Sequence, residues 1–110
     1  MAAETDHAVL AEQLRRRVAE SGVVAQSVRM SALRAGAGEE GAGDEPHVAL
    51  ARTIGEASYR VTDEMVADVQ TGTGSDRASF EVVMSASIGA GLRRWDAALA
   101  VIEEATDAAR

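Results

Sequence analysis

The densest group of chemically active side chains in this sequence is the run Arg93–Arg94–Trp95–Asp96 near its C-terminal end. A guanidinium binds a carboxylate through two parallel hydrogen bonds, and Trp and Arg are enriched at the centres of protein interfaces. Trp95 falls on the apolar stripe of a predicted helix, which favours packing over ligand binding. We therefore expect Trp95, Arg93 and Arg94 to anchor an interface, with Glu81 or Asp96 of a neighbouring chain as the arginine acceptor.

Glu81, His47 and Tyr59 are the candidates for acid–base catalysis. Glu81 borders the same apolar stripe, where burial would raise the pKa of a carboxyl group into a catalytic range. If Glu81 instead lies at the exposed edge of the stripe, its carboxylate would pair with an arginine. His47 as a general base needs a substrate or nucleophile within hydrogen-bond reach, and Tyr59 offers a hydroxyl group. His47 with Asp44 and Glu45 makes a poor metal site on a glycine-rich stretch, so no metal is expected.

Charge and composition exclude several classes of function. The net charge is −7, with 18 acidic against 11 basic residues, which disfavours nucleic acid and anionic membranes as partners. The sequence contains no cysteine, so thiol chemistry and Cys-ligated metals are excluded. Neither a phosphate-binding glycine motif nor a long apolar run is present. We expect a cytoplasmic protein without a bound cofactor.

Hydrophobic periodicity and capping residues predict an all-α domain of five to six helices spanning residues 1–110. Thr5 or Asp6, Pro46, Thr62 and Ser75 mark helix starts. Residues 35–44 form an acidic Gly/Ala-rich stretch without large apolar side chains, and we expect a flexible linker there. The expected helices cover residues 6–20, 23–34, 46–59, 62–70 and 75–105.

The last of these helices carries the strongest pattern. Its apolar and small residues recur at helical spacing, namely Phe80, Val83, Met84, Ser87, Ile88, Gly91, Leu92, Trp95, Leu99 and Ile102. Such a helix is about 45 Å long. Gly89 and Gly91 either kink it or allow a partner helix to approach closely. A helix this long in a small domain is expected to project into an oligomer interface that includes Gly89, Gly91 and Leu99.

The hydrophobic core is expected to be thin. Hydrophobic residues make up 46% of the chain, but much of this fraction is alanine, and Trp, Tyr and Phe each occur once. One chain then has too little large apolar surface to bury for a robust monomer. Self-association buries the faces that a single chain leaves uncovered, so we expect a homo-oligomer.

The stretch from Tyr59 to Leu99 resembles the C-terminal helices of the carboxymuconolactone decarboxylase and alkyl-hydroperoxidase-D-like superfamily. The likeness lies in the short helix VTDEMVADV and the following long helix SDRASFEVVMSASIGAGLRRWDAAL, about 40 of 110 residues. This resemblance implies an all-α fold whose long helices assemble into dimers, trimers or hexamers. Family activities include peroxide reduction and lactone decarboxylation. The peroxidase branch uses a Cys-x-x-Cys pair with His and Glu, and none of these catalytic residues maps onto this cysteine-free chain.

Three hypotheses of function follow. The first is a non-catalytic oligomerising or partner-binding helical protein, such as an accessory subunit of a protein complex. The second is a cofactor-free enzyme of the lactone-decarboxylase type, with Glu81, His47 or Tyr59 acting as acid or base in a pocket between subunits. The third is a carrier of a small apolar ligand, which requires a pocket without converging ionisable groups.

Overall fold

The protein is built from five α-helices and one short 3₁₀ turn, as a computed structural model describes it for residues 2–109, with side chains from Asp6 to Ala109. The elements are α1 (Ala2–Glu20), α2 (Gln26–Gly36), α3 (Pro46–Ala57), the 3₁₀ turn η1 (Ser58–Arg60), α4 (Asp63–Thr73) and α5 (Asp76–Ala108). No strand occurs in residues 2–109. The all-α prediction is confirmed, and so is the long C-terminal helix, which has 33 residues.

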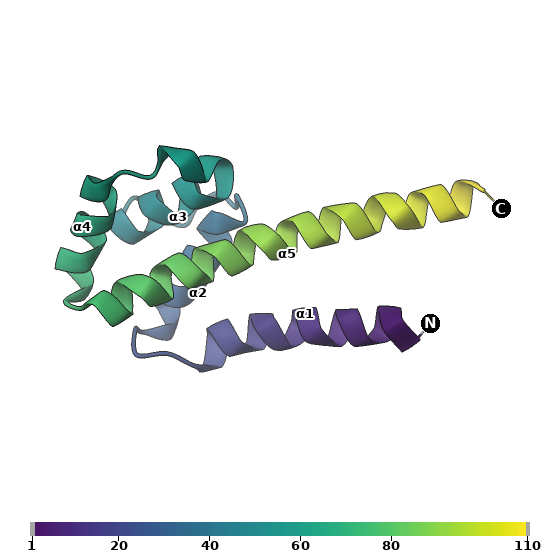
Figure 1. Cartoon of the computed structure of the whole chain (residues 1–110), viewed down its shortest axis with the longest axis horizontal. Coiled ribbons are helices and arrows are strands. Elements are labelled where there is room, and N and C mark those ends of the chain that lie inside the picture. The colour runs from purple at the N-terminus through teal and green to yellow at the C-terminus, as the bar shows by residue number, and fades with distance from the viewer. Residues whose placement is uncertain (1, 110) are drawn as a thin grey trace.

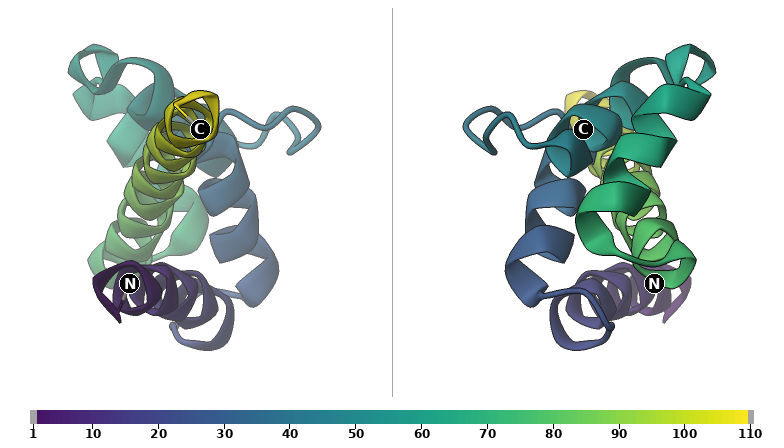
Figure 2. Two further views of the ribbon diagram at one scale, coloured as in Figure 1. Left: turned by 90° about the vertical axis from the view of Figure 1, so that its right-hand side faces the viewer. Right: turned by 90° about the vertical axis from the view of Figure 1, so that its left-hand side faces the viewer.

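Helix α5 runs along the whole molecule, and three of the other helices are arranged around its first half (Figure 1). Helices α2, α3 and α4 form a small bundle with this half, and α1 lies alongside α5 in the opposite direction (Figures 1 and 2). The C-terminal part of α5 extends beyond the bundle, so the molecule is elongated, with extents of 54 × 26 × 22 Å. The two chain ends lie at the same end of the molecule (Figure 1).

Three of the predicted helix starts are confirmed by their caps. The Thr62 hydroxyl accepts a hydrogen bond from the Met65 amide at 3.2 Å, and the Ser75 hydroxyl accepts one from the Ala78 amide at 3.1 Å. Pro46 occupies the first turn of α3, where its missing N–H leaves no bond unmade. The predicted helix start at Thr5 or Asp6 is wrong, because α1 already begins at Ala2.

The boundaries of α2 differ from the prediction at both ends. The helix begins at Gln26 instead of residue 23, because the amides of Val23 and Val24 bind a side chain of α5. It ends at Gly36, so the first two residues of the predicted linker are helical and buried. The connection to α3 is therefore shorter than the predicted linker of residues 35–44.

The core is made mainly of small residues that bring helix backbones close together. Helix α5 buries the face formed by Ala78, Ser79, Val82, Ser85, Ala86, Gly89, Ala90 and Leu92. A Cβ atom on Gly36 of α2 would overlap the Ala86 backbone, and one on Gly55 of α3 would overlap the Gly36 carbonyl. Fully buried Val48, Leu50, Val69 and Val82 fill the space around these contacts.

Gly89 has a different role from the predicted kink or partner contact. Helix α5 is continuous through this residue, and a Cβ atom there would overlap the Leu33 carbonyl oxygen of α2. Gly89 therefore serves a close helix contact within the chain.

Adding one methyl group at this contact tests the close packing. We expect Gly89→Ala to lower the free energy of unfolding by about 1–3 kcal/mol, because the new Cβ must push α2 away from α5. Gly72→Ala is the matched control, since Gly72 is also helical and a Cβ there meets nothing within 4 Å. This control should gain up to about 1 kcal/mol from helix propensity. Urea unfolding measures both, and equal stability of the two variants would contradict the close contact.

Candidate interaction surface

A continuous apolar stripe on α5 faces solvent, opposite the buried small residues. We call Phe80, Met84, Ile88, Gly91, Trp95, Ala98 and Ile102 the outer stripe. Their spacing of three or four residues puts them on one face of the helix. Four of the large side chains are substantially exposed: Phe80 at 62%, Met84 at 42%, Trp95 at 37% and Ile102 at 61%. The predicted periodicity is thus present, but it divides between two faces: these four side chains point away from the chain's own core, whereas Leu92 is buried and Val83 packs against the core.

Helix α1 widens this surface into an apolar groove. Leu10 and Leu14 of α1 are exposed beside the outer stripe. The groove between the two helices has a volume of about 370 Å³ and is lined by His7, Leu10, Ala11, Leu14, Ile88, Gly91, Leu92 and Trp95. The imidazole of His7 meets the Trp95 ring edge-on, with the ring centroids 6.0 Å apart. An apolar hollow with one polar side chain at its end suits an apolar group or the face of another helix.

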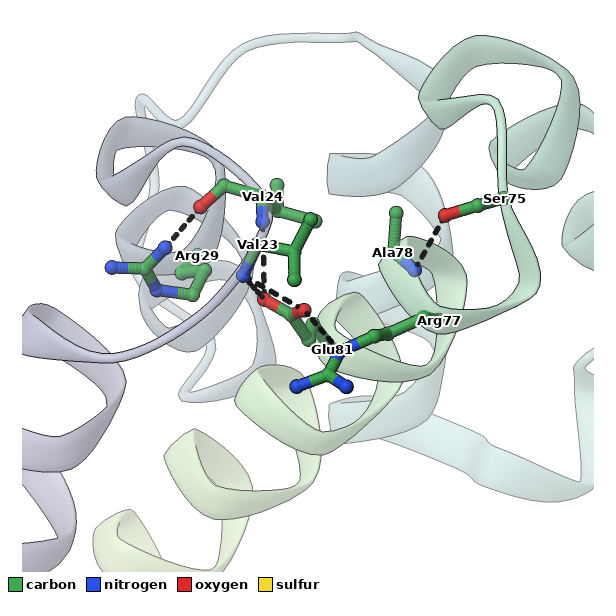
Figure 3. A network of polar contacts seen from close by, with 7 residues as sticks. All are labelled: Val23, Val24, Arg29, Ser75, Arg77, Ala78 and Glu81. Atoms are coloured by element: carbon green, nitrogen blue, oxygen red, sulfur yellow. Dashed lines mark hydrogen bonds and ion pairs between the residues drawn. The ribbon is translucent and has the colours of Figure 1, made fainter.

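Glu81 fixes the chain reversal that places α1 against the body (Figure 3). Its carboxylate accepts hydrogen bonds from the Val23 amide at 2.8 and 2.9 Å and from the Val24 amide at 3.1 Å. The Arg77 guanidinium lies 3.7 Å from the same carboxylate. The Glu81 side chain is only 15% exposed. Its charged carboxylate is therefore largely covered, and it accepts hydrogen bonds from backbone amides that have no partner within a helix.

Arg29 holds the other side of the same reversal (Figure 3). Its guanidinium donates to the carbonyl oxygens of Val18 at 2.7 Å and Ala19 at 3.1 Å, and also to the carbonyl of Val24. A cation is favourable at the C-terminal end of a helix, because the last carbonyls lack intrahelical partners. This buried arginine was not predicted, although it lies one turn before Ala32 on the inner face of α2.

Glu81, Arg29 and residues 22–24 together form what we call the α1 clasp. Gly22 passes between the two charged side chains with φ of +152°, and a Cβ atom there would overlap the Glu81 carboxylate. Burial acts to raise the pKa of Glu81. The amides of Val23 and Val24 and the charges of Arg77 and Arg29 outweigh burial, and the pKa is lowered from its ordinary value of 4.5. The clasp is therefore stabilised by an ionised carboxylate.

The remaining polar contact between α1 and α5 is exposed. The Arg15 guanidinium donates to the Asp96 carboxylate at 2.8 Å, with both side chains more than a third exposed. Such a surface pair contributes at most about 1 kcal/mol. The clasp and the apolar contacts, more than this pair, set the position of α1.

The predicted interface arginines bond within the chain. Arg93 donates to the Ala37 carbonyl at 2.9 Å, and Arg94 donates to the Gly55 carbonyl at 3.2 Å. The carboxylates expected to receive them from a neighbour, Glu81 and Asp96, have arginine partners on their own chain. Among the other predicted interface residues, Gly91 is exposed with open space around it and Leu99 is half-buried.

The three acid–base candidates are not brought together. Glu81 belongs to the α1 clasp, and His47 lies half-buried in the first turn of α3. Tyr59 is 83% exposed in η1, with the Arg60 guanidinium 5.9 Å from its ring centroid. Across the part of the chain that the structure describes, no three His, Asp or Glu side chains are placed to hold a metal ion. No buried side-chain polar atom in that part lacks a hydrogen-bond partner.

Comparisons with protein-family models, with curated proteins and with solved structures found no match to this chain. None of the described helices is both long and apolar enough to cross a membrane.

Removing the charge of Glu81 tests the clasp. Glu81→Gln keeps the shape but loses the ionised acceptor, so we expect the free energy of unfolding to fall by about 1.5–3 kcal/mol at neutral pH. Because the pKa of Glu81 is lower in the folded state, its contribution is complete above pH 4.5 and is lost as the pH falls through the folded-state pKa. The stability difference between wild type and Glu81→Gln should therefore shrink below pH 4.5.

Asp68→Asn provides the control, since Asp68 is an exposed carboxylate in the middle of α4. Its effect should be small at every pH. Chemical unfolding at a series of pH values measures all three proteins. A difference for Glu81→Gln that stays constant into the acid range would show that the ionised carboxylate does not stabilise the clasp.

Proposed function

We propose that this chain is a non-catalytic helical protein that acts by associating with other helices. The outer stripe of α5 and the adjoining groove form the binding surface. The observation that carries the proposal is the exposure of Phe80, Met84, Trp95 and Ile102 on one continuous helix face. Single exposed apolar residues are ordinary on protein surfaces, whereas a contiguous apolar patch is typical of an interaction site.

The total surface of the chain supports association. A compact monomer of 11.5 kDa exposes about 5,800 Å², whereas this chain exposes 7292 Å². Its radius of gyration is 15.6 Å, against about 13 Å for a compact domain of this length. The excess of about 1,500 Å² exceeds the roughly 800 Å² that each partner contributes to a specific interface.

The family resemblance gives this surface a biological setting. Members of the carboxymuconolactone decarboxylase and alkyl-hydroperoxidase-D-like superfamily assemble through long helices, and the residues that resemble them here include most of the outer stripe. The chain lacks the cysteine pair of the peroxidase branch. An accessory or scaffolding subunit of a cytoplasmic complex is the role that fits both features.

A small apolar-ligand carrier is the second candidate, favoured by the groove itself. Its volume of about 370 Å³ lies within the range of small-molecule sites, about 300–1,000 Å³. The lactone-decarboxylase-like alternative gains no such support, because Glu81, His47 and Tyr59 lie on separate elements with separate partners.

Truncation of the largest side chain on the surface tests the proposal. We expect Trp95→Ala to shift the protein from an assembled form toward the 11.5 kDa monomer, because a central aromatic side chain typically contributes about 2–4 kcal/mol to an interface. Sedimentation velocity of the two proteins measures the change. Circular dichroism confirms that the variant is still helical.

Tyr59→Ala is the matched control for this experiment. Tyr59 is a more exposed aromatic residue, but it lies in η1, away from the outer stripe. Its removal should leave the sedimenting mass unchanged. Equal masses for wild type, Trp95→Ala and Tyr59→Ala would contradict the proposed surface.

A further inference from the structure

We infer that the partner helix on this surface is α5 of a second copy of the chain, lying antiparallel to the first with a two-fold axis near Gly91. This inference rests on the proposed function and specifies the partner. It follows from the distribution of size and charge along the outer stripe. It also follows from the part of α5 that its own chain leaves uncovered.

The uncovered part is the C-terminal extension of α5. Residues 100–109 are all exposed, and the bundle of α2, α3 and α4 does not extend along them (Figure 1). This extension carries Ile102 of the outer stripe at 61% exposure. At the other end of the same face, Phe80 and Met84 are also exposed. One chain therefore has two apolar surfaces without a partner, on opposite sides of Gly91.

An antiparallel pair about Gly91 brings these two surfaces together. Phe80 precedes Gly91 by as many residues as Ile102 follows it, and Met84 and Ala98 are likewise symmetric about it. Phe80 would then face the partner's Ile102, and the long Met84 side chain would face the small Ala98 of the partner subunit. At the axis, a Cβ atom on Gly91 would meet nothing within 4 Å, so two backbones can approach there.

Charge selects the antiparallel orientation over the parallel one. The C-terminal extension carries Glu103, Glu104 and Asp107, and the last turn of α5 as described holds no basic side chain. These carboxylates lie near the negative end of the helix dipole, which is unfavourable in the single chain. A parallel pair would place two such acidic ends side by side. Of these three carboxylates, Glu104 and Asp107 lie on the same face of α5 as Ala100, opposite the outer stripe, whereas Glu103 borders the stripe beside Ile102.

The antiparallel pair gives Glu103 a basic neighbour on the partner. Arg77 lies in the first turn of α5, and Arg17 of α1 lines the same hollow as Met84. Both arginines are exposed, and both lie at the end of the stripe that the partner's C-terminal extension would cover. Each chain thus carries both of the surfaces, and both of the charges, that would meet in this pair. A second copy therefore fits the surface better than an unrelated helix.

Engineered cysteines test the arrangement directly, because the natural chain contains none. A disulfide requires Cα atoms about 4.4–6.8 Å apart. We expect Gly91→Cys alone to form a linked dimer under mild oxidation. A mixture of Met84→Cys and Ala98→Cys chains, distinguished by a mass tag, should form the mixed dimer in preference to either like pair.

Ala100→Cys is the control, since residue 100 is exposed on the opposite side of α5 from the outer stripe. Ala100→Cys should form only the small amount of linked dimer that random collisions produce. Linking should also weaken at high salt, because exposed charges are screened. The Met84 and Ala98 pair keeps Gly91 intact, so it remains informative if a cysteine at the axis disturbs packing.

The outcomes separate this inference from the proposed function. Preferential linking of Met84→Cys to itself and of Ala98→Cys to itself would show a parallel pair and overturn the inference. An assembled protein that links at none of these positions would overturn it as well, while the proposed function stands. A wild-type chain that remains monomeric at all concentrations and binds no other protein overturns both.

Discussion

The close approach of α2, α3 and α5 is the constraint on which the rest of the structure depends. At three places, Gly36 against Ala86, Gly55 against Gly36 and Gly89 against Leu33, a single added carbon would collide with a neighbouring backbone. Packing of this kind gains dispersion energy from many backbone contacts, but it leaves no room for large side chains at the points where the backbones meet. The largest apolar residues of α5, Phe80, Met84 and Trp95, lie on its outer face, while the smaller Val82 and Leu92 are buried. The surface that we assign to association is thus the counterpart of the small-residue core.

The same constraint explains how α1 is attached. With the small-residue face of α5 occupied by α2 and α3, α1 meets α5 at the border of the outer stripe and leaves a groove there. Its C-terminal end is held by Arg29 and Glu81, which satisfy carbonyl and amide groups at the chain reversal. Polar groups in a covered position are costly to leave unpaired, so the clasp specifies where α1 leaves the body, while the apolar groove remains open toward solvent.

Much of the secondary structure could be predicted from the sequence, because its signals are local. Thr62 and Ser75 cap helices through their own side chains, Pro46 fits a first turn, and the spacing from Phe80 to Ile102 gives the long helix. The direction in which that stripe points could not be predicted, since periodicity identifies a face without saying what covers it. The predicted role of Gly89 is wrong for the same reason: a glycine that admits the chain's own α2 has the same local sequence as one that admits a partner. Arg29 and Glu81 are joined only through the fold, so the clasp has no local signature.

The most direct measurement of the central claim uses Trp95, the single tryptophan of the chain. Acrylamide quenching of its fluorescence reports how accessible the indole ring is, and it can be followed as protein concentration rises from nanomolar to millimolar. If the outer stripe is an association surface, quenching should decrease and the emission should shift to the blue as the sedimenting mass increases. Quenching that stays constant while the mass increases would place association elsewhere on the molecule. Constant quenching with a constant monomer mass would contradict association altogether.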